Sequence, residues 1–156
     1  MKRAAVFIIF ITLAFYGSAF AQGKPDFSGT WILDMAKSDM GQGRPSAATR
    51  KVTLVIKQTP AVLTIERKVS ERSETATFKL DGSESVNKSP SGQDIKSTSR
   101  WVGSTLLTKS IMSTEEGTAE MSDVRSLSAG GKVMTIDVTR KTGRGEVKQK
   151  LIYNRE

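Results

Sequence analysis

The chain has 156 residues, a formal net charge of +8, and neither cysteine nor histidine. These two absences exclude disulfides, Cys or Ser-His nucleophiles, haem held through histidine and the usual zinc sites. Any enzyme built from this chain would have to work with carboxylates, lysine, tyrosine or serine alone, and we expect no cofactor and no metal.

The first 21 residues have the pattern of a cleaved secretory signal. Lys2 and Arg3 precede an uncharged apolar run over residues 4–15, and the segment ends in Ala19-Phe20-Ala21, which fits a cleavage site. An uncleaved membrane anchor is the alternative, but the apolar run is short of a full membrane span. We therefore expect residues 1–21 to be a signal peptide and residues 22–156 to form one domain that is secreted or periplasmic.

Removal of Lys2 and Arg3 lowers the net charge from +8 to +6. The remaining basic residues are scattered singly along the chain, whereas nucleic-acid-binding proteins cluster them beside stacking aromatic residues. We therefore expect no nucleic-acid partner. A basic exterior fits solvation, together with peripheral contact with an anionic envelope surface.

In chain order, the first predicted strand lies within residues 27–33, where Phe27, Gly29, Trp31 and Leu33 share one face. Residues 35–49 contain two glycines, one proline and no apolar periodicity, which predicts a loop with at most one helical turn. Dense β-branched residues then predict three more strands, over 51–58, 61–69 and 74–82. The polar stretch 83–93 predicts a short edge strand around Val86 and a mobile tip at 89–92.

From residue 95 the pattern becomes a meander joined by two-residue turns at Gly103-Ser104, Glu116-Gly117, Gly130-Gly131 and Gly143-Arg144. Counting outward from each turn puts the strands in register. The counting places Met121, Asp123, Arg125 and Leu127 opposite Arg140, Val138, Ile136 and Met134, which in turn face Val147, Gln149, Leu151 and Tyr153. It also pairs Trp101 with Leu106, Ser99 with Thr108 and Ser97 with Ser110. Across the next turn, it pairs Leu106, Thr108, Ser110 and Met112 with Leu127, Arg125, Asp123 and Met121, respectively.

This face carries nearly all the apolar residues of the closing strands, whereas the opposite face pairs Asp137 with Lys150 and Lys141 with Glu146, as an exposed surface should. About eight to ten short strands with no crossover helix predict an all-β fold, a single antiparallel up-and-down β-barrel. We expect the first strand to pair with the last, so that closure leaves no exposed edge.

The order of these segments resembles the fatty-acid-binding proteins within the wider lipocalin-like (calycin) superfamily. Residues 27–33 (FSGTWIL) are similar to that family's first strand, residues 52–82 to its second to fourth strands, and residues 124–136 with 151–156 to its last strands. The resemblance implies that Arg125 and Tyr153 match the interior arginine and tyrosine that hold a ligand carboxylate. The family's second arginine is replaced by Leu151, and residues 35–49 are too short for its two-helix lid.

The inward polar residues allow two interpretations. An arginine inside a barrel needs a partner because an unpaired buried charge is costly, and Asp123 lies two residues from Arg125 on the same face. In the first interpretation these two satisfy each other, and Thr108, Ser110, Gln149 and Tyr153 complete their hydrogen bonds or hold interior water. In the second, the same polar residues bind a ligand head group, while the apolar tail lies against Trp101, Leu106, Met112, Met121 and Leu127.

We therefore predict an exported, monomeric barrel that binds a small hydrophobic or amphipathic ligand, an acyl chain among the candidates. The alternative is a filled barrel that acts as a protein-interaction or inhibitor module in the cell envelope. An enzyme is the least favoured function, because proton transfer needs a group tuned towards neutral pH and the interior set offers none. An empty interior of about 300 Å³ or more would favour the ligand over the filled barrel.

Overall fold

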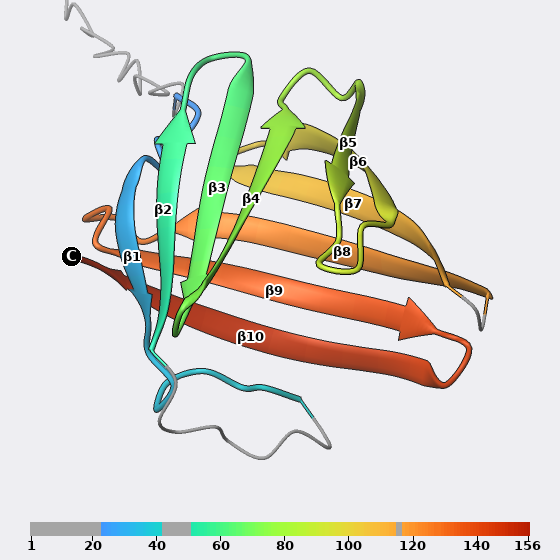
Figure 1. Cartoon of the computed structure of the whole chain (residues 1–156). Coiled ribbons are helices and arrows are strands. Elements are labelled where there is room, and N and C mark those ends of the chain that lie inside the picture. Colours follow the sequence, from blue (N-terminus) through green and yellow to red (C-terminus); the bar gives the residue numbers. More distant parts are fainter. Residues whose placement is uncertain (1–22, 42–50, 115–116) are drawn as a thin grey trace, which may run out of the picture.

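The structure is a computed structural model that describes residues 23–41, 51–114 and 117–156 (Figure 1). The predicted signal peptide and its cleavage site lie outside the described residues, as does most of the predicted loop before residue 50. The described ranges form ten strands: β1 (Gly29–Leu33), β2 (Val52–Gln58), β3 (Val62–Val69), β4 (Arg72–Lys79), β5 (Glu84–Lys88), β6 (Asp94–Val102), β7 (Thr105–Thr114), β8 (Gly117–Leu127), β9 (Val133–Thr142) and β10 (Gly145–Arg155). They contain no helix with the length and apolarity that a membrane crossing needs.

The ten strands make one antiparallel sheet in the order β4-β3-β2-β1-β10-β9-β8-β7-β6-β5. The predicted pairing of the first strand with the last is confirmed, since Trp31 pairs with Arg155 and Leu33 with Tyr153. The sheet curls until its two end strands, β4 and β5, lie side by side (Figure 1). The fold is therefore the predicted all-β up-and-down barrel, nearly closed.

The seam between β4 and β5 corrects the prediction that no edge remains. β5 has only five residues, and side chains rather than a backbone ladder join it to β4. The Thr77 amide donates to Asn87 Oδ1 at 2.8 Å, Asn87 Nδ2 donates to the Thr77 carbonyl at 3.0 Å, and the Lys79 amide donates to Ser85 Oγ at 2.8 Å. The short β5 cannot form a backbone ladder along the whole of β4. The side-chain amide of Asn87 therefore satisfies the backbone groups of Thr77 that a neighbouring strand would otherwise pair.

The predicted registers of β6 with β7, β8 with β9, and β9 with β10 are confirmed. The predicted register of β7 with β8 is wrong by two residues, because Gly117, which the prediction placed in the turn, pairs with Thr114 as part of the ladder. The observed pairs are Leu106 with Arg125, Thr108 with Asp123, Ser110 with Met121 and Met112 with Ala119. A shift of two residues keeps every side chain on its face, so the predicted inward set is unchanged.

The apolar core fills one end of the barrel. Five of its side chains are completely inaccessible to solvent: Phe27, Trp31, Leu63, Leu106 and Met134. The one polar atom among them is satisfied, since Trp31 Nε1 donates to the Phe27 carbonyl at 2.8 Å. Burying each such side chain contributes about 1.5–3 kcal/mol to the stability of the fold.

At the other end of the barrel, the described residues leave the inner face uncovered. Strands β7 to β10 have 10, 11, 10 and 11 residues, whereas β2, β3 and β4 have 7, 8 and 8, so the long strands extend beyond the short ones (Figure 1). Inward-facing residues near the far ends of the long strands are consequently uncovered: Val147 is 39% exposed, and Met112 and Met121 are half-buried. The described part of the predicted loop after β1 forms no helix and runs along β10, where Asp39 bridges to Lys150.

Candidate functional site

The centre of the predicted site is an ion pair in the middle of the barrel. Arg125 and Asp123 both point inward from β8 and are 6% and 7% exposed. Arg125 Nη2 donates to Asp123 Oδ2 at 2.8 Å, and Arg125 Nη1 donates to Thr108 Oγ1 at 3.3 Å. The pairing predicted from the sequence is confirmed, although the backbone of Arg125 lies opposite Leu106 rather than Thr108. A charge-assisted bond of this length is among the stronger polar contacts of a protein interior.

Buried hydroxyl groups continue from this pair across β7 and β6. Thr108 Oγ1 shares a hydrogen bond with Ser99 Oγ at 2.8 Å, and Ser110 Oγ shares one with Ser97 Oγ, also at 2.8 Å. All four residues are buried. Thr108 thereby connects the ion pair to the hydroxyl pairs, whereas Ser110 is satisfied by Ser97 rather than by Arg125.

Two polar groups of this interior have no hydrogen-bond partner among the described residues. One is Arg125 Nε, which is buried and donates to nothing. The other is the hydroxyl of Tyr153: the residue is only 3% exposed, but its oxygen is not among the fully buried unpartnered atoms and therefore reaches solvent. Burial raises the pKa of Tyr153, and the positive charges of Arg67 and Arg125 act against that rise. Buried polar groups in native proteins nearly always meet water, a ligand or another residue, so Arg125 Nε identifies a place for an acceptor, and the Tyr153 hydroxyl can donate to water or to a ligand nearby.

Arg67 on β3 is a site residue that the sequence reasoning missed. It follows Leu63 and Ile65 at two-residue spacing and so shares their inward face, with Leu54 and Glu74 as its cross-strand neighbours. Arg67 is an exposed residue, yet its positive charge acts on Tyr153 and lowers the pKa of that hydroxyl. An arginine that continues an apolar alternation was the available signal. The charges that act on the Tyr153 hydroxyl are therefore those of two arginines and one aspartate.

The remaining predicted site residues lie elsewhere. Gln149 Nε2 donates to the Met40 carbonyl at 2.7 Å, so this side chain holds the segment after β1 against β10. Met112 and Met121 lie on the uncovered inner face at the open end. Trp101 lies at the filled end of the barrel, separated from Arg125 across the sheet by Leu106.

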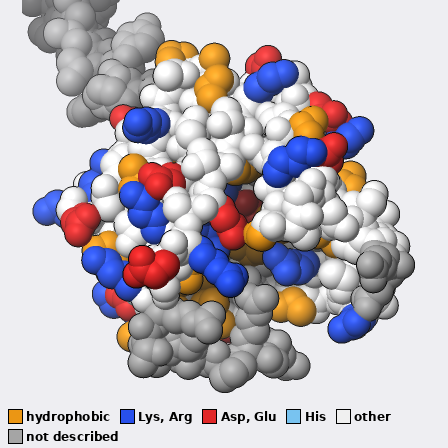
Figure 2. Space-filling model, in the orientation of Figure 1, with side chains coloured by type: hydrophobic (Ala, Val, Ile, Leu, Met, Phe, Trp, Pro, Cys, Tyr) orange, Lys and Arg blue, Asp and Glu red, His pale blue; other side chains and the backbone are white. Residues whose placement is uncertain are grey.

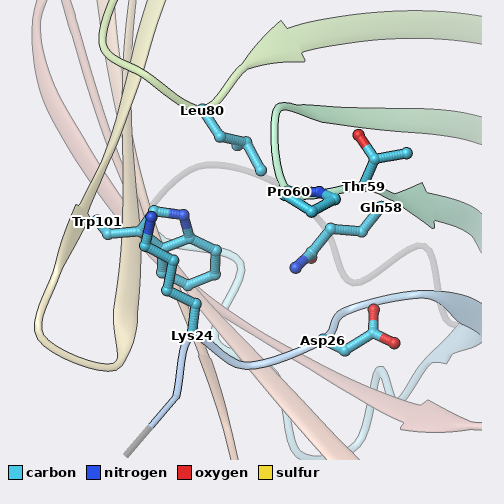
Figure 3. Close-up of a pocket in the computed structure, with 7 residues that line it drawn as sticks. All are labelled: Lys24, Asp26, Gln58, Thr59, Pro60, Leu80 and Trp101. Atoms are coloured by element: carbon cyan, nitrogen blue, oxygen red, sulfur yellow. The ribbon is translucent and has the colours of Figure 1, made fainter.

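Trp101 lines a cavity of about 320 Å³ at that end (Figure 3), together with Lys24, Asp26, Gln58, Thr59, Pro60 and Leu80. The cavity is just larger than the minimum of about 300 Å³ expected of a ligand site, but neither Arg125 nor Tyr153 lines it. The nine predicted residues are therefore divided between the interior cluster, the open end, this cavity and, for Gln149, the contact with the segment after β1.

The interior can also be approached from the side. In the orientation of Figure 1, the molecule is hollowed near the centre of the face that carries the β4–β5 seam, with charged side chains of both signs around the hollow (Figure 2). No group of three or more histidine, cysteine, aspartate or glutamate side chains in the described ranges could hold a metal ion.

Comparison with known proteins supports the fold. A solved structure titled "REP1-NXSQ fatty acid transporter" matches with a TM-score of 0.59 and 20% sequence identity, covering 83% of this chain and 95% of that chain. At this identity the similarity shows a shared fold alone. No protein-family model matches the chain, and no curated protein matches it.

Proposed function

We propose that the chain is an exported binding protein rather than an enzyme, and that its barrel interior takes a small amphipathic ligand with an acidic head group. The observation that carries this proposal is the presence of two unpartnered polar groups, Arg125 Nε and the Tyr153 hydroxyl, inside one barrel. Each can donate a hydrogen bond, so a ligand that offers acceptor oxygens would satisfy both.

Charge favours an acid over a neutral or cationic head group. Asp123 neutralises one arginine through the 2.8 Å contact, and Arg67 brings a second positive charge to the neighbourhood of Tyr153. An anion between Arg67, Arg125 and Tyr153 would gain charge-assisted hydrogen bonds, whereas a cation would face two guanidinium groups.

The tail of the ligand would lie towards the open end. Met112, Met121 and Val147 face inward there and are only partly covered. Methionine side chains adapt to irregular apolar shapes, which suits an acyl chain of variable length. The shared fold with a structure titled as a fatty acid transporter supports a lipid-like ligand.

Location and assembly belong to the same proposal. The pattern of residues 1–21 supports export to a secreted or periplasmic location, with a new N-terminus at Gln22 and a net charge of +6 that favours anionic envelope surfaces. We propose that the barrel works as a monomer. N-terminal sequencing of protein recovered outside the cytoplasm tests the cleavage site, and a start other than Gln22 would contradict it.

Thermal melts with saturated fatty acids, and with the alcohols of the same chain length, test the interior site. Palmitate should raise the melting temperature of the wild type more than hexadecanol does, because only the acid meets the arginines. Arg125→Leu should weaken palmitate binding by about 2 kcal/mol and Tyr153→Phe by about 1 kcal/mol. Arg100→Leu is the matched control, since Arg100 is an exposed residue of β6, and should change nothing. A wild type that responds to no acid of the series would refute the proposal.

A filled barrel that binds a protein partner is the second candidate. Two observations favour it: Arg125 is already paired with Asp123, and the 320 Å³ cavity lies away from that pair. Under this function the acids leave the melting temperature unchanged, while the ion pair still contributes to stability. The same set of melts therefore separates the two candidates.

A further inference from the structure

The cavity at the filled end of the barrel has walls that the fold holds in place. Gln58 fastens the N-terminal segment, because Phe27 N donates to Gln58 Oε1 at 3.1 Å and Gln58 Nε2 donates to the Pro25 carbonyl at 2.9 Å. Arg155, at the end of β10, donates to the Ser28 carbonyl at 2.8 Å and to the Asp26 carbonyl at 3.3 Å. The cavity is therefore a built feature of about 320 Å³, in the range of small-molecule sites.

The indole of Trp101 presents an unused hydrogen-bond donor beside this cavity. Trp101 Nε1 is buried and has no partner among the described residues, in contrast to Trp31 Nε1, which donates to the Phe27 carbonyl. Phe27 stacks on the Trp101 ring with centroids 5.9 Å apart and planes 10° apart, so the ring is held in position. Figure 3 shows Trp101 and Gln58 on opposite sides of the cavity. A water-sized probe does not reach this nitrogen, so a molecule in the cavity that Trp101 lines would supply the missing acceptor after a small movement of neighbouring side chains.

The charges around the cavity favour an anion. Lys24 Nζ lies 5.9 Å from the centre of the Trp101 ring, and Lys24 has no carboxylate partner within the described part of the chain. Asp26 is the one acidic residue of the lining, and its carboxylate is turned away from Trp101 (Figure 3). The Ser28 amide donates to Asp26 Oδ1 at 2.8 Å, so this carboxylate is already engaged.

We infer that this cavity is a second binding site, distinct from the interior cluster, for a compact organic anion of the size of benzoate. Its carboxylate would accept from Trp101 Nε1 and lie near Lys24. Its apolar body would fit between Pro60 and Leu80, of which Leu80 is only 5% exposed and forms an apolar wall.

The two tryptophans of the chain allow a local test. In ¹H–¹⁵N spectra of the purified protein they give two indole signals, and Trp31, whose donor is occupied, is the internal control. A titration with sodium benzoate should move the Trp101 signal progressively and to saturation while the Trp31 signal stays in place. Benzyl alcohol, which has the same ring without the charge, should bind more weakly.

Variants then identify the charge and the donor. Lys24→Gln should weaken benzoate about threefold, the effect of a solvent-exposed charge pair, whereas Lys57→Gln, the same charge change on an exposed residue of β2 outside the lining, should not. Trp101→Phe keeps a ring but removes the donor, and should weaken benzoate about fivefold. For this variant the binding is followed on the benzoate protons by saturation transfer.

Three results would overturn the inference. The first is a Trp101 signal that does not move with benzoate, or that moves only together with the Trp31 signal. The second is equal binding of benzoate and benzyl alcohol, or an equal effect of Lys24→Gln and Lys57→Gln. Either result would show that the negative charge of the ligand is not recognised. The third is loss of the benzoate response in both Arg125→Leu and Tyr153→Phe, which would place the bound benzoate in the interior cluster instead.

Discussion

Replacing Arg125 by leucine should destabilise the fold by about 3–5 kcal/mol. The structure supplies the reason for this magnitude. The substitution removes the 2.8 Å contact with Asp123 and the 3.3 Å contact with Thr108, and Asp123 is only 7% exposed. Water has little access to this carboxylate, which would be left buried without a counter-charge.

Removing both charges should restore much of the loss. Leucine at both Arg125 and Asp123 leaves apolar side chains of similar volume next to the core, and buried ion pairs replaced in this way are often no less stable than the original. Urea melts of the wild type, both single variants and the double variant give the coupling energy between the two residues. A double variant no more stable than Arg125→Leu would refute the pairing argument, because the buried aspartate would then not be the source of the loss.

Three further predictions concern other parts of the fold. Burial raises the pKa of Tyr153 above its ordinary value of 10.0, so the folded state holds the hydroxyl proton more tightly than the unfolded state does. The stability that this difference contributes is present below pH 10 and is lost as the pH rises through the folded pKa. Urea melts at pH 8 and pH 11 should therefore show a smaller loss of stability in Tyr153→Phe than in the wild type, and equal losses would contradict this. Asn87→Ala should speed amide exchange at Thr77 about fivefold, since it removes the 2.8 Å acceptor across the seam, and unchanged exchange would show that the seam is held by other contacts. Gly41→Ala should cost about 1–3 kcal/mol in thermal melts, because Gly41 has a φ of +73° and an added Cβ would meet the Lys148 carbonyl; a neutral effect would show that the segment after β1 moves freely.

Alternation and turn spacing were enough to predict the inward face of the closing strands. Arg125 and Asp123 are buried as expected, and so is Tyr153 on β10, two strands away in the sheet. The β7–β8 register was misplaced because Gly117 was taken as a turn residue, whereas it is the first residue of β8 and has a φ of +113°. Side chains point to alternate faces with a period of two, so this error left the set of interior residues intact.

Features that depend on contacts distant in sequence could not be read in this way. The seam between β4 and β5 depends on the reach of Asn87 to Thr77 across a gap that no local pattern encodes. The approach of Arg67 to Tyr153 depends on how the sheet curls, because β3 and β10 are not neighbours in the sheet. The cavity beside Trp101 likewise exists only after the N-terminal segment has folded across the end of the barrel.

The most direct test of the interior site is the carboxyl resonance of [1-¹³C]palmitate added to the protein. A carboxylate held between Arg125 and Tyr153 should give a bound signal separate from that of the free acid. Arg125→Leu should greatly reduce this signal, as a loss of about 2 kcal/mol in binding requires, while Lys24→Gln, which alters only the cavity at the filled end, should leave it unchanged. The absence of a bound signal in the wild type, or a bound signal that survives Arg125→Leu at full intensity, would contradict an acid-binding barrel interior.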